Sequence, residues 1–100
     1  MTRLVDIAHG RAGDKGDTSI LMVAPYAPGD YARVEQACST AAVAAHFAVP
    51  VDSVTVIANP VLLALTIVIR GLLDGGVTRS GRIDPHGKTI AAHLLELECD

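Results

Sequence analysis

A run of charged residues and glycines at positions 9–18 carries the side chains best suited to chemistry. One imidazole, two cations, two carboxylates and three glycines fall within these ten residues. The glycines let the backbone approach a ligand closely, and an imidazole beside a carboxylate is suited to general acid–base chemistry. We therefore predict His9 and Asp14 as candidate catalytic residues. The binding contacts predicted from the same run are Arg11, Gly13, Lys15, Gly16 and Asp17.

Three interpretations of this run remain open. Its backbone N–H groups, with Arg11 and Lys15, suit a phosphate or a carboxylate, although the spacing is neither a P-loop nor a dinucleotide fingerprint. His9, Asp14 and Asp17 could hold a divalent cation, but two carboxylates three residues apart are common, so we assign no metal and no cofactor. The third interpretation is a hairpin tip whose side chains only cap their own backbone.

A second polar cluster lies near residue 80. Arg79 and Ser80 are predicted binding residues, whereas Arg79 and Arg82 would point to opposite faces of a strand and so would not form one clamp. Of the remaining histidines, His46 is expected to pack within the fold and His93 to lie on the surface.

The elements that must position these residues alternate between strands and helices. Apolar runs bounded by Gly and Pro predict strands over Leu4–His9, Thr18–Ala24, Val54–Ala58 and Val77–Ile83. The polar run 9–18 is expected to be a long loop between the first two of these strands. Helical spacing predicts helices over 31–47, with a break near Ser39-Thr40, and over Lys88–Leu97.

The segment 59–73 has conflicting signals. Asn59-Pro60 resembles a helix start and Gly75 a helix end, and fourteen residues between them are long for a strand. Against this, residues 66–69 are β-branched throughout. We favour a helix on length and caps. With a strand here the order becomes ββαββα, a ferredoxin-like fold with its last strand moved to the front. The fold class is α+β in both cases, with a mixed or antiparallel sheet.

Composition narrows the classes of function. At 100 residues the chain is expected to be one domain, and a net charge of −3 argues against nucleic-acid binding. The apolar run Val61–Ile69 is too short to span a membrane, and the N-terminus is not a signal peptide. Cys38 and Cys99 lack metal-site or redox spacing. We expect a soluble cytoplasmic protein, and its mean hydropathy of +0.39 suggests an oligomer or partner interface.

Four motifs in order resemble the C-terminal domain of AtuA-type proteins, named for acyclic terpene utilisation. The most specific is His9-x-Arg11-x-Gly13-Asp14-Lys15-Gly16-Asp17. The others are Val43-Ala44-Ala45-His46-Phe47, Gly75-Gly76-Val77-Thr78-Arg79-Ser80, and Asp84-x-x-Gly87-Lys88-Thr89. Ala12 and Ile20 depart from the family pattern, which has Ser and Asn at these positions.

The resemblance implies a ferredoxin-like α+β domain of about four strands, which acts beside or within a larger AtuA-like chain. It also implies the catabolism of branched acyl compounds, expected as acyl-CoA. We therefore expect a small accessory subunit whose Gly/Asp/Lys run completes a site or an interface. The alternatives are a hydratase or lyase acting alone on an acyl-CoA, and a homo-oligomeric ligand-binding module.

Overall fold

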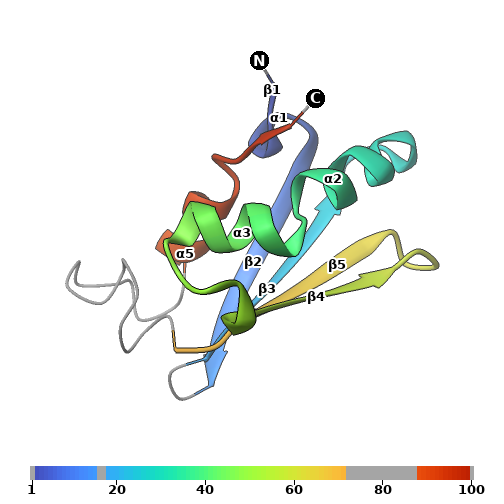
Figure 1. The fold of residues 1–100 in the computed structure, drawn as a ribbon. Helices are drawn as coiled ribbons and strands as arrows, with labels where there is room; N and C mark the ends of the chain where they lie inside the picture. Colours follow the sequence, from blue (N-terminus) through green and yellow to red (C-terminus); the bar gives the residue numbers. More distant parts are fainter. Residues whose placement is uncertain (1, 16–17, 72–87, 100) are drawn as a thin grey trace.

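The computed structural model describes residues 2–15, 18–71 and 88–99, and its centre is a four-stranded antiparallel sheet with helices on one face (Figure 1). The strand order is β2-β3-β5-β4, and β1 and β6 form a separate two-stranded ladder. In chain order the elements are β1 (Thr2–Arg3), α1 (Leu4–Ile7), β2 (Ala8–Lys15), β3 (Thr18–Pro25), η1 (Pro28–Asp30), α2 (Tyr31–Ala37), α3 (Thr40–Phe47), η2 (Val51–Ser53), β4 (Val54–Asn59), β5 (Ala64–Ile69), α5 (Lys88–Leu94) and β6 (Glu98–Cys99).

The topology is the ferredoxin-like α+β fold with its last strand moved to the front. β3 and β4 both pair antiparallel with β5, which lies between them, and α2 and α3 connect β3 to β4. This is a split βαβ unit. β2 precedes it and pairs along the outer side of β3. The fold class and the four-stranded sheet predicted from the sequence are confirmed.

The core lies between the sheet and the helices. Side chains alternate along each strand, so one face packs against α2, α3 and α5 and the other faces away from them (Figure 1). Aliphatic side chains fill this core, as the near absence of aromatic residues predicts. The larger fully buried side chains are Phe47, Leu4, Leu21, Leu65, Ile67, Ile69, Ile90 and Leu94.

The polar run at 9–18 is mostly strand, so the prediction of a long loop was wrong. β2 extends to Lys15 and pairs residue by residue with β3, from Ala8 opposite Pro25 to Lys15 opposite Thr18. β2 is an edge strand of the sheet, so its ladder with β3 pairs only one side of its backbone. Edge strands tolerate charged residues and glycines because only one side of them is paired.

The first apolar run is a single helical turn, so the predicted strand over Leu4–His9 was also wrong. Asp6 Oδ2 accepts a hydrogen bond of 2.9 Å from the Arg3 backbone N–H, which supports a helix start at Leu4. Leu4 is completely buried, and its backbone N–H donates to the Leu97 carbonyl at 2.8 Å. The turn therefore anchors the N-terminus against the C-terminal segment.

The helix favoured over 59–73 is wrong for the described part of that segment, which ends at Gly71 and forms the turn from β4 into β5. Asn59 does not begin a helix; its Oδ1 accepts from the Leu62 backbone N–H at 3.1 Å. Leu63 adopts a left-handed φ of 54°, which reverses the chain into β5. β5 then pairs on both sides, with β3 and with β4. In β5 the residues at 66–69 pack well against the pleated sheet.

The other predicted elements hold with small shifts. The strands at 18–24 and 54–58 are confirmed as β3 and β4, and two helices with a break near residue 39 are confirmed as α2 and α3. Ser39 is the N-cap of α3, because its Oγ accepts from the Ala42 backbone N–H. The last helix ends at Leu94, and β6 follows it. The predicted strand at 77–83 lies outside the described residues. No described helix has the length and apolar character to cross a bilayer.

Candidate functional site

The face of the sheet that no described helix covers carries the described side chains of the predicted site. We call it the open face. His9, Arg11 and Gly13 alternate along β2 with residues that face the helices, and all three are exposed. From the remaining strands the open face receives Ile20, Met22 and Ala24 of β3, Ala64, Thr66 and Val68 of β5, and Thr55 and Ile57 of β4.

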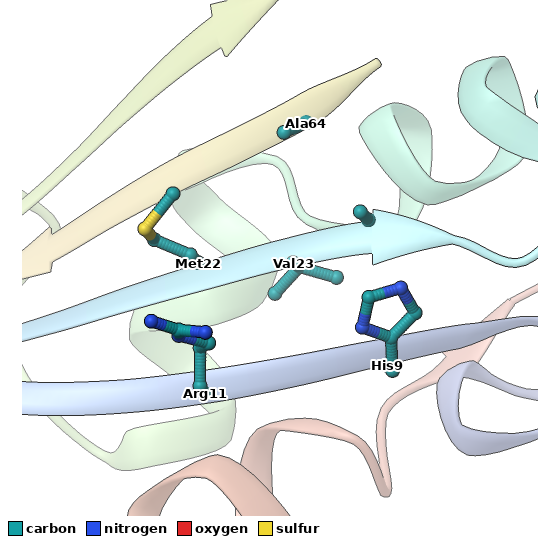
Figure 2. Close-up of a pocket in the computed structure, with 6 residues that line it drawn as sticks. His9, Arg11, Met22, Val23 and Ala64 are labelled. Carbon is teal, nitrogen blue, oxygen red and sulfur yellow. The ribbon is translucent and has the colours of Figure 1, made fainter. Parts of the chain in front are cut away.

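A shallow groove of about 290 Å³ crosses this face at the start of β5. Figure 2 shows His9 and Arg11 projecting from β2 on the same side as Met22 and Ala64. Ala24 lies opposite His9 in the ladder, and Met22 lies opposite Arg11. The groove exists because Ala24 and Ala64 are small while their neighbours on the face are long. Its lining is therefore mainly apolar, with a cation at one side.

The His9 ring is held beside an aromatic neighbour. Its centroid lies 5.1 Å from that of the Tyr26 ring, at an interplanar angle of 38°. Tyr26 follows the end of β3, and its backbone N–H donates to the Ile7 carbonyl at 2.9 Å. The contact orients the imidazole at the end of the groove, in a position where it can donate or accept a hydrogen bond.

Arg11 has no hydrogen bond or ion pair within the part of the chain that the structure describes. Other arginines are engaged. Arg33 lies 3.3 Å from Asp30 Oδ1 on the helical side, and Arg70 donates to Thr55 Oγ1 at 3.1 Å and to the Asp52 carbonyl at 2.9 Å. As far as the described residues go, the Arg11 guanidinium is available to an external carboxylate or phosphate.

The remaining predicted residues are further from the groove or outside the description. Asp14 and Lys15 end β2, opposite Ser19 and Thr18 of β3. Five residues of extended strand at about 3.3 Å each place the Cα atoms of His9 and Asp14 roughly 16 Å apart. Their roles as catalytic residues stay a prediction. Gly16, Asp17, Arg79 and Ser80 lie outside the described residues, and no described cluster of three or more metal-ligating side chains occurs.

Sequence reasoning missed the apolar half of the groove. Met22 is 48 % exposed although it lies between the buried Leu21 and Val23. The signal was present in the run at 18–24, where large apolar residues occupy both alternating phases of a strand. Because the described helices cover only one face of the sheet, the side chains of one of these two alternating sets must be exposed. That pattern marks a second surface that another molecule can cover.

Comparison with known proteins agrees with this fold. The family model described as the AtuA ferredoxin-like domain matches residues 2–100. No curated protein and no solved structure matches the chain. The match extends over the strands of the open face and the helices behind them, and it includes the run from His9 to Asp17. The chain belongs to the AtuA ferredoxin-like domain family.

Proposed function

We propose that the chain is a small cytoplasmic accessory subunit that docks through its open face onto a larger AtuA-like chain. In this proposal the two chains act in the breakdown of branched acyl compounds carried as coenzyme A thioesters. The site or the interface is completed by β2, through Arg11, Asp14 and Lys15. Gly16 and Asp17, with Arg79 and Ser80, are proposed to contribute to it.

The exposure of large apolar side chains on the open face carries this proposal. Ile20, Met22 and Ile57 are 37 %, 48 % and 53 % exposed. The first two lie on β3 and the third on β4, and both strands pair with β5 in the same sheet. Large apolar side chains exposed together on one face of a small protein support a contact site for another molecule. The helices cover the opposite face, so the open face is the one with room for a partner (Figure 1).

Charge favours a different chain over a second copy. The open face carries Arg11, His9 and Arg70, and none of its described side chains is acidic. A second copy would bring the same cations, whereas a partner with carboxylates would neutralise them. Cys38 and Cys99 are both buried and are not joined in a disulfide, which is typical of a reducing compartment and supports the cytoplasmic assignment.

The geometry gives less support to an enzyme that acts alone. An acid–base pair must lie within hydrogen-bond reach of the same substrate atoms. His9 and Asp14 are separated along one extended strand by roughly 16 Å, so they do not form such a pair within this chain.

Co-purification with the larger chain tests the proposal, and Met22→Lys is the informative variant. A lysine at the centre of the open face would place a charge against an apolar partner surface. We expect association to weaken at least tenfold while the unfolding midpoint stays unchanged, because Met22 is half exposed. Gln36→Lys, an equal addition of one positive charge on exposed α2, is the control and should associate normally.

A second variant tests the polar end of β2. The double change Asp14→Ala, Lys15→Ala should weaken the association of the two chains or lower the activity of their complex on an acyl-CoA. Association and turnover that are unchanged in both this variant and Met22→Lys would refute the proposal. A dimer of the isolated chain that Met22→Lys abolishes would favour the homo-oligomeric binding module instead.

A further inference from the structure

We propose that the groove between His9, Arg11 and Ala64 binds a small aliphatic carboxylate. The Arg11 guanidinium takes the carboxylate, and the hydrocarbon part lies against Met22, Ala24 and Ala64. This inference deepens the proposed function, because it assigns a class of ligand to the same face. It rests on the proposed function in one respect: the larger chain is what covers the groove.

The shape of the groove selects a small apolar body. The small side chains of Ala24 and Ala64 line it together with the longer Met22 side chain. Its volume of about 290 Å³ lies at the lower end of the range of about 300–1,000 Å³ that is usual for small-molecule sites. An aliphatic chain of a few carbons would replace water over these methyl groups without displacing any backbone.

The charge of the groove selects an anion. Arg11 is unpaired within the described residues, and no described side chain of the open face is acidic. His9 and Arg11 are alternate residues of one strand, so their Cα atoms lie about 7 Å apart and their side chains project from the same face. One carboxylate between them can accept two parallel N–H bonds from the guanidinium and a third from the imidazole.

The groove is open on one side, which predicts weak binding by the isolated chain. A ligand lying there keeps much of its surface in water and gains only part of the burial energy of an enclosed site. A second chain over the open face would enclose it. We therefore expect millimolar affinity for the chain alone and tighter binding in the complex.

Titration of the isolated chain with 3-methylbutanoate, followed by NMR, tests this inference. We expect saturable shifts confined to the open-face residues of β2, β3 and the start of β5. Two matched probes separate the contributions. Acetate has the charge without the hydrocarbon, 3-methylbutan-1-ol has the hydrocarbon without the charge, and each should bind about tenfold more weakly.

Two variants and a control complete the design. Arg11→Gln removes the cation, and Ala64→Leu fills the groove without changing charge; each should weaken binding of 3-methylbutanoate at least tenfold. Arg33→Gln removes a cation from the helical side and should leave the affinity unchanged. Equal affinity for the alcohol, shifts elsewhere on the protein, or normal binding by Arg11→Gln would each overturn the inference.

This outcome is separable from that of the docking proposal. A chain that associates with the larger chain but does not bind 3-methylbutanoate refutes the ligand assignment alone. A chain that binds 3-methylbutanoate but does not associate with the larger chain refutes the docking proposal and leaves the groove as a ligand site.

Discussion

The Cys38 thiol lies fully buried at the C-terminal end of α2, and burial raises its pKa to about 12. The nearby Cys99 adds to this increase, because two thiolates would repel each other. A thiolate in the core loses the solvation that stabilises its charge. Cys38 is therefore a protonated, weakly nucleophilic packing residue at neutral pH.

This pKa predicts a loss of stability at high pH. The thiol of the unfolded chain ionises near its ordinary pKa of 9.0, whereas the folded protein holds the proton until about pH 12. The stabilising contribution is complete below pH 9 and is lost as the pH rises toward 12, with a slope of at most about 1.4 kcal/mol per pH unit. Urea unfolding between pH 8 and 11 should show a steeper decline for the native sequence than for Cys38→Ala. Equal declines in the unfolding free energy of the two proteins would contradict this prediction.

Two glycines of β2 provide a matched pair for a second prediction. A Cβ at Gly10 would lie 3.1 Å from the Met22 carbonyl oxygen of the paired strand, whereas a Cβ at Gly13 would meet nothing within 4 Å. We expect Gly10→Ala to cost about 1 kcal/mol of unfolding free energy and Gly13→Ala to change it by under about 0.5 kcal/mol. Thermal or urea unfolding measures both, and equal costs would show that the ladder yields freely at Gly10.

At the scale of elements, two histidines join α3 to the segment of α5. The imidazole rings of His46 and His93 stack at 4.2 Å between centroids. The Nε2–H of His46 donates to the His93 carbonyl at 2.6 Å, and that of His93 donates to the His46 carbonyl at 3.3 Å. Phe47 meets both rings edge-on. His46 packs as predicted, but His93 is half-buried rather than on the surface.

This reciprocal contact predicts non-additive substitutions. His46→Ala or His93→Ala should each cost about 1–2 kcal/mol of unfolding free energy, because each removes a ring contact and one hydrogen bond. The double variant should cost less than the two single costs together, because each single change already breaks the shared stack. His9→Ala, on the exposed open face, is the control and should stay within about 0.5 kcal/mol. Additive costs would show that the rings act independently.

The elements that were predictable from the sequence are those with one clear local signal. The apolar run TSILMVA, stopped by Pro25, identified β3, and helical spacing identified α2 and α3. The errors fall where a local signal has two uses. Asn59-Pro60 can begin a helix or a hairpin, and only pairing of β5 with two neighbours decides between them. Likewise, glycines and charges at 9–15 suit a loop or an edge strand.

The candidate site was predictable only in part, for a related reason. His9 and Arg11 stand out by residue type, and the structure places them on one face of β2. Met22, Ala24 and Ala64 carry no chemical signal of their own, and they form a groove only because three strands bring them together. A surface of this kind depends on sheet order and register, which a single sequence does not reveal.

At the scale of the whole molecule, the two sides of the sheet differ both in what packs on them and in the charges they carry. The helices and most described carboxylates lie on one side of the sheet, at Asp6, Asp30, Glu35, Glu96 and Glu98. The open face presents apolar side chains with His9, Arg11 and Arg70 among them. A net charge of −3 therefore conceals a basic, apolar face. That asymmetry is the basis for expecting an external partner with carboxylates.

The most direct test observes the Met22 methyl group while the larger AtuA-like chain is added. The chain has two methionines, so methyl labelling gives a simple NMR spectrum in which Met22→Leu assigns the signal. If the open face is the contact surface, the Met22 methyl signal shifts or broadens in proportion to the complex formed. A complex confirmed by its mass, in which that signal keeps its free position and width, would contradict the account.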